Sequence, residues 1–193
     1  MNVLPWLVLP AAYLLGGFSP GYWLVRLRTG ADLRTQGSGA TGATNAARLL
    51  GKGGFALVLL LDALKGALAV LVARAAGLVD GWEFAAGTAV VAGHVWPVQL
   101  RFRGGRGLGP VLGAWLTLAP VAIGACLVIA GVCWAITKRR IWSGLFGTLL
   151  LPVTTWWVTR NPTATACTAI AFCIITFAHR SHFRSTAASA GNA

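Results

Sequence analysis

The chain has 193 residues, of which 56% are apolar and 10% are charged, against about 25% charged residues in a typical soluble domain. Its net charge is +12, from 16 basic and 4 acidic residues. Apolar runs of roughly 17–25 residues recur, which is the length of a membrane-spanning helix. The composition excludes a soluble enzyme. The basic residues lie in short loops between apolar runs, which also argues against a nucleic-acid-binding module.

We therefore expect one all-α integral membrane domain over residues 1–193, with a disordered tail from about residue 185. The first apolar run starts almost at Met1 and lacks a basic segment before it, so we expect a retained helix rather than a cleaved signal peptide. The expected helices, in chain order, lie at about 4–27, 53–75, 84–100, 108–118, 121–137, 141–159 and 163–178.

Two of these segments contain a proline that shapes the prediction. Pro20 and the glycines of 16-GGFSPG-21 should interrupt the first helix. Residues 108–137 would measure about 45 Å as one helix, longer than a hydrocarbon core of about 30 Å. Because Pro120 divides this stretch, we expect a hairpin of two short helices there.

The distribution of basic residues sets the expected orientation. In this arrangement Arg74 and Arg160 lie on one side, Lys65 lies within a helix, and the other basic residues lie on the opposite side. Positive charge accumulates on the cytoplasmic side of a membrane protein, so we expect the N-terminus outside and the C-terminus in the cytoplasm. The chain is then a compact bundle of about seven transmembrane helices.

Two glycine-rich, cationic segments fall on the expected cytoplasmic side. These are 37-GSGATGATNAARLLG-51, within a loop expected over about 28–52, and 101-RFRGGRG-107. Glycine lets the backbone approach a ligand closely, and successive backbone N–H groups can cradle an anion. The two segments therefore indicate a phosphorylated substrate handled at the bilayer surface.

A charged pair lies inside the helix expected over 53–75. Asp62 and Lys65 in 62-DALKG-66 are three residues apart and share a helix face. Charges at that depth are costly, so they should pair or line a polar cavity. One interpretation is a structural ion pair that ties the helix to its neighbours. The other is that Lys65 holds a phosphate group and Asp62 orients it.

Nothing in the sequence indicates a metal ion, another cofactor or a disulfide. The four cysteines lie inside apolar segments without CxxC spacing, at Cys126, Cys133, Cys167 and Cys173. Four scattered acidic residues cannot build a two-metal carboxylate cluster, which argues against a metal-dependent lipid phosphotransferase.

Three ordered motifs resemble those of the bacterial acyl-phosphate:glycerol-3-phosphate acyltransferases. The run 13-YLLGGFSPGYWLVRLRTGADLRTQGSGATGATNAARLLG-51 looks like a GSGN-x-GATN-x-x-R segment preceded by DLR. The run 62-DALKG-66 matches a D-x-x-KG element, and 93-GHVWPVQLRFRGGRG-107 is similar to GH-x-x-PV-x-x-x-F-K-GGKG. The resemblance covers nearly the whole chain and weakens after Gly107.

The resemblance implies a bacterial inner-membrane enzyme of seven spans. It would move a fatty acyl group from acyl phosphate to the 1-hydroxyl of glycerol 3-phosphate, giving lysophosphatidic acid and phosphate. Its implied partners are the two substrates and membrane lipid, without cofactor, metal or nucleic acid, and we expect a monomer. Acyl phosphate is an activated anhydride, so the enzyme has to orient two anions and neutralise charge rather than create a strong nucleophile.

The same resemblance implies the site residues. Catalytic roles fall on Ser38, Arg48, Arg106, Ser143 and His179. Substrate binding falls on Gly37, Gly39, Gly42, Thr44, Asn45, Asp62, Lys65, His94, Arg103, Gly104, Gly105, Gly107 and His182. Within this set, Ser38 and Arg48 belong to the glycerol-phosphate side and Arg106 binds a phosphate. The glycines 104, 105 and 107 present backbone N–H groups to the acyl phosphate.

Structural interpretations remain open beside these roles. Ser38 could cap a helix over 40–50, and His94 could be a packing histidine at a kink. His179 could lie at a helix end and complement its dipole, and Arg101 and Arg103 could anchor lipid headgroups. Several positions depart from the family pattern, at Ala40, Arg103, Arg106, Pro110 and His182. The alternatives are therefore a divergent enzyme that acylates another phosphorylated or polyol acceptor, and an inactive or anion-binding membrane protein.

Overall fold

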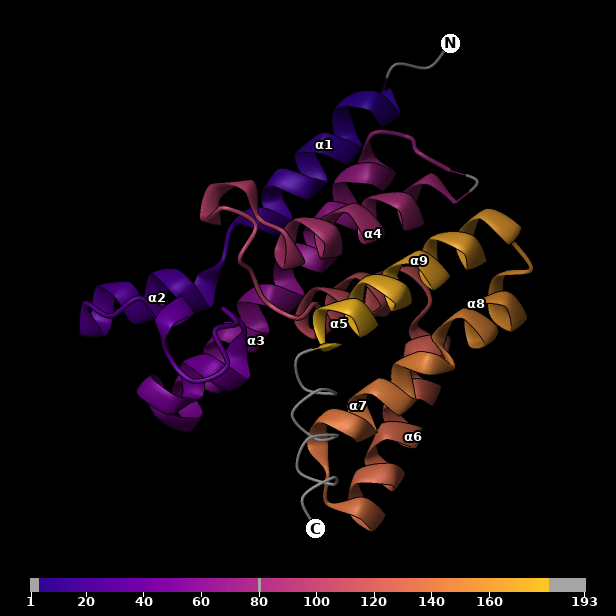
Figure 1. The fold of residues 1–193 in the computed structure, drawn as a ribbon. Helices are drawn as coiled ribbons and strands as arrows, with labels where there is room; N and C mark the ends of the chain where they lie inside the picture. Colours follow the sequence, from indigo (N-terminus) through magenta and orange to yellow (C-terminus); the bar gives the residue numbers. More distant parts are fainter. Residues whose placement is uncertain (1–3, 80, 181–193) are drawn as a thin grey trace.

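The computed structural model describes residues 4–79 and 81–180, which form a helical bundle (Figure 1). The described part contains α1 (Leu4–Gly17), α2 (Pro20–Thr29), α3 (Ala43–Ala75), α4 (Trp82–Val95), α5 (Leu108–Leu118), α6 (Pro120–Thr137), α7 (Arg140–Leu149), α8 (Leu151–Thr159) and α9 (Pro162–Ala178). Two short 3₁₀ turns, η1 (Leu33–Thr35) and η2 (Val98–Leu100), lie in loops. The expected tail from residue 185 lies outside the described residues.

Two of the expected helices are each divided in two. The predicted kinked helix over 4–27 is instead α1 and α2, because Pro20 starts a new helix at the position where its missing N–H costs nothing. In the same way, Pro152 lies at the start of α8 and separates it from α7. When each divided pair counts as one segment, the described chain has the seven segments that the sequence predicts, including the hairpin of α5 and α6.

One helix boundary differs from the prediction, and one helix has an added first part. Helix α3 joins two helical parts at Gly51, whose φ of 68° and ψ of −164° are not helical, so the long part begins close to the expected residue 53 and a shorter part from Ala43 precedes it. Its N-cap is Gly42, so Ser38 does not cap it. Helix α4 ends at Val95 rather than near residue 100, since Pro97 cannot donate the next helical hydrogen bond.

Glycines let the central helices approach closely. A methyl group at Gly113 of α5 would lie 1.7 Å from the Ala63 carbonyl oxygen of α3. Likewise, a methyl group at Gly93 of α4 would lie 1.9 Å from the Tyr13 carbonyl oxygen of α1. Small residues at such contacts are typical of helices packed in a membrane. These contacts fix α1, α3, α4 and α5 as the rigid centre of the bundle.

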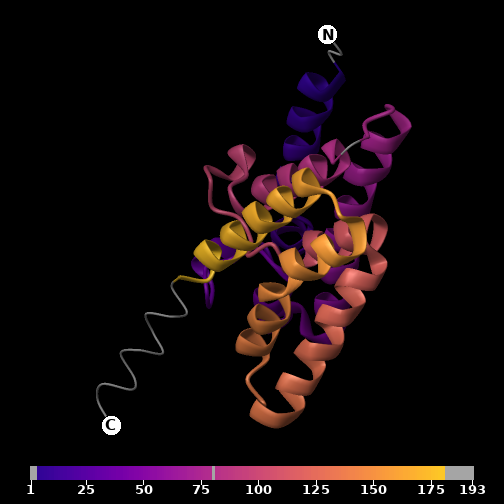
Figure 2. The ribbon, with the colours of Figure 1, turned by 90° about the vertical axis from the view of Figure 1, so that its right-hand side faces the viewer.

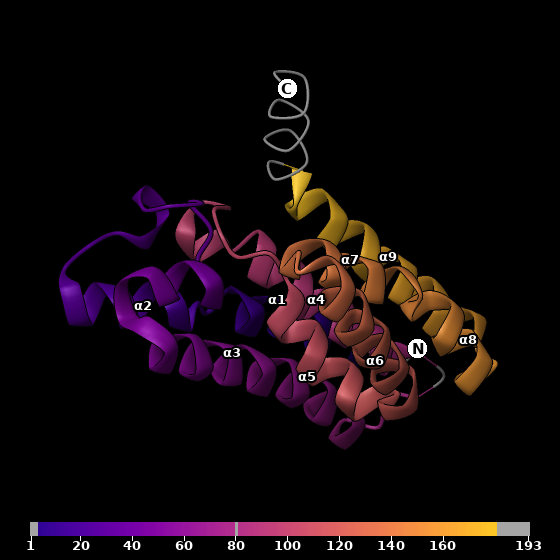
Figure 3. The ribbon, with the colours of Figure 1, turned by 90° about the horizontal axis from the view of Figure 1, so that it is seen from below.

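The other helices lie around this centre. Figure 3 shows α2 and the start of α3 on one side and α6, α7 and α8 grouped on the other. Figure 2 shows α6 running along the outer edge of the bundle, where it packs against α7 and α8. Trp115 of α5 is fully buried in a core to which α4, α6 and α9 also contribute, with its indole N–H 3.3 Å from the Thr168 hydroxyl.

The outer faces are apolar. In the described chain, three stretches are long and apolar enough to cross a membrane, at Ala43–Ala75, Pro120–Thr137 and Ile141–Thr159. Large apolar side chains point outward, among them Trp6, Val121, Ile136 and Trp157, each more than half exposed. Lipid contact accounts for these faces, since each helix satisfies its own backbone hydrogen bonds. The protein is an integral membrane protein with several apolar helices.

Candidate active site

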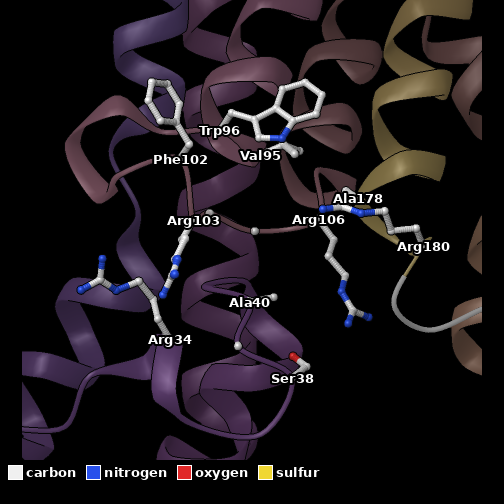
Figure 4. A pocket seen from close by; sticks show the side chains of 13 residues that line it. Arg34, Ser38, Ala40, Val95, Trp96, Phe102, Arg103, Arg106, Ala178 and Arg180 are labelled. Atoms are coloured by element: carbon white, nitrogen blue, oxygen red, sulfur yellow. The ribbon is translucent and has the colours of Figure 1, made fainter. Parts of the chain in front are cut away.

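A cavity of about 590 Å³ opens where two loops meet the end of α9 (Figure 4). The first loop is residues 30–42, between α2 and α3, and the second loop is residues 101–107, before α5. The described residues that line the cavity are Arg34, Ser38, Gly39, Ala40, Val95, Trp96, Phe102, Arg103, Gly104, Gly105, Arg106, Ala178 and Arg180. The two glycine-rich segments singled out from the sequence therefore face one common space.

Asn45 organises the first loop from the start of α3. Its buried side-chain amide lies within donating distance of three carbonyl oxygens, those of Leu33, Gln36 and Ala40, at 3.1, 2.9 and 2.9 Å. Its side-chain oxygen accepts a hydrogen bond of 3.2 Å from the Ser38 N–H. Asn45 thus holds Ser38 at the cavity, and its amide is engaged within the loop.

Glycine at position 37 makes room for Arg48. Gly37 has a positive φ of 51°, and a methyl group on it would lie 2.1 Å from an Arg48 guanidinium nitrogen. The Arg48 side chain, which comes from the exposed face of α3, therefore lies directly over the first loop. Thr44 is also exposed at this end of α3, and Gly42 is the N-cap of the helix.

The second loop is fixed by backbone hydrogen bonds. Gly104 N–H donates to the Val95 carbonyl at 3.2 Å, and Gly105 N–H donates to the His94 carbonyl at 2.9 Å. The end of α4 therefore accepts both of these N–H groups in this structure, and their predicted role toward the acyl phosphate stays a prediction. The Gly104 carbonyl accepts a bond of 3.1 Å from Thr41 N–H, which joins the two loops directly.

Gly107 has a different place from the other two glycines. It takes a φ of +88° and is the N-cap residue of α5. The N-terminus of a helix carries backbone N–H groups without helical partners and favours anions. Its predicted role toward a phosphate stays a prediction.

Arginine side chains dominate the cavity. Figure 4 shows Arg103 and Arg106 pointing from the second loop toward the first loop, where Arg34 and Ser38 lie. Arg180 reaches in from the end of α9, with its guanidinium carbon 4.1 Å from the centre of the Phe177 ring. Among the described lining residues there is no carboxylate and no imidazole.

The charges in this region are mostly unmatched. Partial burial and the neighbouring Arg48 guanidinium lower the pKa of Arg106, as expected for two like charges without an anion between them. Arg34 is the exception, because its guanidinium donates to the Asp32 carboxylate, with nitrogen and oxygen 2.6 Å apart. This contact lowers the pKa of Asp32 to about 2 and raises the pKa of Arg34. Arg103, Arg106 and Arg180 therefore offer positive charge to an anionic group in the cavity. The predicted site residue Arg48 is not among the described lining residues but lies close enough to act on Arg106.

Three predicted binding residues form a separate buried cluster instead. Asp62, Lys65 and His94 are each at most 5% exposed, and none of them lines the cavity. The Lys65 ammonium is 2.8 Å from an Asp62 carboxylate oxygen and 2.8 Å from Nδ1 of His94. It also donates to the carbonyls of Gly16 and Phe18, at 3.0 and 2.8 Å. This geometry favours the structural interpretation of the pair over direct phosphate binding.

Two further predicted residues, His179 and Ser143, are not among the described residues that line the cavity. His179 is buried at the end of α9, with Nδ1 2.9 Å from the Ile175 carbonyl oxygen. Ser143 is buried in α7, where its hydroxyl donates to the Arg139 carbonyl at 2.9 Å. The next residue, Gly144, lies close to Leu108 at the start of α5. His182 lies outside the described residues.

Several residues that line the cavity are not among the predicted site residues. Arg34 is one of them, although it belongs to the DLR element of the first motif. Arg180 is another, although it directly follows the predicted His179. Trp96 and Phe102 add an apolar wall, and the Trp96 ring packs against Phe177 with centroids 5.9 Å apart. An aromatic wall beside clustered arginines suits a ligand with an anionic head and an apolar tail.

The fold and the cavity define an integral membrane protein with an arginine-lined cavity where two loops meet the end of α9. A family model described as glycerol-3-phosphate acyltransferase matches residues 6–189. "Glycerol-3-phosphate acyltransferase 1" of Desulfitobacterium hafniense is 44% identical over 173 residues, covering 90% of this chain and 86% of the relative. The glycerol-3-phosphate acyltransferase of a Synechococcus species is 40% identical over 177 residues, covering 91% and 88%. The chain belongs to the glycerol-3-phosphate acyltransferase family.

Solved structures agree with this assignment. The crystal structure of PlsY (YgiH), an integral membrane glycerol 3-phosphate acyltransferase in its glycerol 3-phosphate form, superposes with a TM-score of 0.89. That match has 27% sequence identity and covers 96% of this chain and 93% of the other. A second PlsY structure, in its lysophosphatidic acid form, has a TM-score of 0.85 at 24% identity and supports the fold.

Proposed function

We propose that the cavity is the active site of this glycerol-3-phosphate acyltransferase and that its acyl donor is acyl phosphate. As a member of the family, the protein is an enzyme that acylates glycerol 3-phosphate to lysophosphatidic acid. The observation that carries the proposal is the meeting of both glycine-rich loops and four arginines around one cavity. Two phosphate-bearing substrates suit this concentration of positive charge, in which Arg34 is paired with Asp32 while Arg103, Arg106 and Arg180 face no carboxylate among the described lining residues.

The reaction exchanges one carbon–oxygen bond for another and moves one proton. The 1-hydroxyl oxygen of glycerol 3-phosphate attacks the acyl carbon, and the bond between that carbon and the phosphate oxygen breaks. The hydroxyl proton moves to an oxygen of the departing phosphate, so the products are 1-acyl-glycerol 3-phosphate and inorganic phosphate. This proton path suits a cavity whose described lining residues include no carboxylate or imidazole base.

The residues divide between the two substrates. Ser38, held by Asn45, and Arg48 orient glycerol 3-phosphate from the first loop. Arg106 and Arg103 of the second loop hold the phosphate of the donor and stabilise the charge that grows as it leaves. The acyl chain lies along the apolar wall of Val95, Trp96 and Phe102 toward the lipid.

Ser143 and His179 complete the proposed machinery. His179 is buried between the lining residues Ala178 and Arg180, and Ser143 is buried in α7, next to Gly144, which lies close to Leu108 at the start of α5. We assign them to the donor side, together with Gly107 at the start of α5. The enzyme acts as a monomer in the bacterial cytoplasmic membrane with its cavity facing the cytoplasm, as the distribution of basic loop residues favours.

Purified protein in detergent tests the proposal. It should release phosphate from palmitoyl phosphate only when glycerol 3-phosphate is present, with lysophosphatidic acid formed in equal amount. Phosphate release with another phosphorylated or polyol acceptor, but not with glycerol 3-phosphate, would instead identify a divergent acceptor. The absence of turnover with every acceptor would reject the proposed activity.

A further inference from the structure

The second loop rests on the ring of a buried histidine. Gly105 is buried, and a methyl group on it would lie 2.1 Å from Nε2 of His94, 2.6 Å from Cε1 and 3.0 Å from Cδ2. All three nearest atoms belong to this one imidazole ring. The ring therefore limits how near the Cα side of Gly105 can approach α4, beside the backbone hydrogen bond from Gly105 N–H to the His94 carbonyl.

The ring is itself held from the other side. Nδ1 of His94 lies 2.8 Å from Nζ of Lys65 and 3.4 Å from an Asp62 carboxylate oxygen. The Lys65–Asp62 pair thus orients the ring from its Nδ1 side, while Nε2 faces the Gly105 position.

His94 and Val95 also hold the loop through their main chain. Their carbonyls accept the N–H groups of Gly105 and Gly104, so ring and backbone of the same segment contact the same two glycines. The next residue is Arg106, whose side chain points into the cavity. A small shift of Gly105 must move Arg106 as well.

We propose that His94 is a positioning residue for the acyl transfer. Its ring, oriented by Lys65, sets the distance between Gly105 and α4. That distance in turn sets the position of the Arg106 guanidinium in the cavity. This inference rests on the proposed function of the cavity. It assigns His94 an action through the loop, without contact to either substrate.

Adding a methyl group at Gly105 and removing the ring of His94, singly and together, tests the inference. Gly105→Ala places a methyl group against the ring, so the loop must move by roughly 1 Å, and kcat/KM should fall about 100-fold. His94→Ala removes the ring and should cost about tenfold, since the backbone bonds of the loop remain. In the double variant the new methyl group occupies the vacated space, and kcat/KM should recover to the level of His94→Ala.

The variants should remain folded. Lys65 has three N–H groups, and without His94 it still has three acceptors, on Asp62, Gly16 and Phe18. Gly131→Ala is the matched control for added bulk, because a methyl group there meets no atom within 4 Å. It should leave both thermal stability and kinetics unchanged. The loss in Gly105→Ala should fall mainly on the KM for acyl phosphate, which a general loss of folded enzyme would not reproduce.

Hydrogen exchange gives a readout that does not need turnover. A peptide covering residues 98–108 contains the Gly104 and Gly105 amides, and its exchange should accelerate in Gly105→Ala and slow again in the double variant. A double variant as impaired and as fast-exchanging as Gly105→Ala would overturn the inference. If the unaltered protein transferred no acyl group, the proposed function would fail, while the exchange rates would still decide whether His94 positions the loop.

Discussion

The buried cluster and the cavity differ in how their charged side chains are paired. In the buried cluster, the Lys65 ammonium is surrounded by a carboxylate, two carbonyls and an imidazole. Around the cavity, Arg106 faces the like charge of Arg48, and the described lining residues offer it no acid. The matched charges lie between packed helices, and the unmatched ones lie where two loops leave space.

This difference separates scaffold from site. A buried ion must have partners inside the protein, because desolvation would otherwise destabilise it strongly. A cation at an open cavity can take its partner from the substrate. The contrast predicts that changes in the buried cluster reduce stability, whereas changes at the cavity reduce activity in a folded protein.

Lys65→Met should give the largest effect on stability. It leaves the Asp62 carboxylate buried without its cation and removes the donor to the Gly16 and Phe18 carbonyls, a loss of about 3–5 kcal/mol. Thermal unfolding in detergent measures this. The matched control is Lys52→Met, an exposed lysine in the same helix, which should change little. If both variants unfolded at the same temperature, the cluster would not be the scaffold.

Arg48→Ala should give the largest effect on activity. The residue is exposed and its removal relieves the like-charge contact with Arg106, so folding should be unaffected. Loss of one preorganised cation should lower kcat/KM by about 10²–10³-fold. Arg160→Ala is the control, because that arginine lies over Trp157 at the end of α8. Unchanged kinetics in Arg48→Ala would remove Arg48 from the site.

The sequence predicted the scaffold better than the site. Apolar runs and the prolines at positions 20 and 120 gave the seven segments, because helix length and proline placement are local properties. The meeting of the two loops also followed, since both were expected on one side of the membrane. The backbone bonds of Gly104 and Gly105 could not be predicted, because they depend on where α4 ends in space. For the same reason Arg34 and Arg180 are not among the predicted site residues.

Arg106→Ala should have an intermediate effect. Removing one of several cations around a phosphate should raise the KM for acyl phosphate by roughly tenfold, about 1.4 kcal/mol, with a smaller change in kcat. Arg106→Lys keeps the charge but replaces the planar fork by a compact ammonium, so it should recover most of the loss. Steady-state kinetics at saturating glycerol 3-phosphate separates the two parameters. An Arg106→Lys enzyme as weak as Arg106→Ala would show that the fork, rather than the charge, is required.

Asp32→Asn should give the smallest effect, because it alters a matched pair at the edge of the cavity. Asp32 has a folded pKa of about 2 against a usual 3.8, so its ionised form stabilises the fold above pH 3.8. That contribution is lost as the pH falls through about 2. Since the pair is partly exposed, solvent screening limits it to about 0.2–1 kcal/mol.

Thermal unfolding of the unaltered protein and of Asp32→Asn at pH 7 and pH 3 tests the expected direction of this pH dependence. The difference between unaltered protein and Asp32→Asn should be present at pH 7 and smaller at pH 3, where the unfolded carboxylate is already largely protonated. A difference that grew on acidification would mean that Asp32 is stabilised in its neutral form. Arg34 would then be as unmatched as Arg106, and the contrast between the cluster and the cavity would extend to every arginine in the lining.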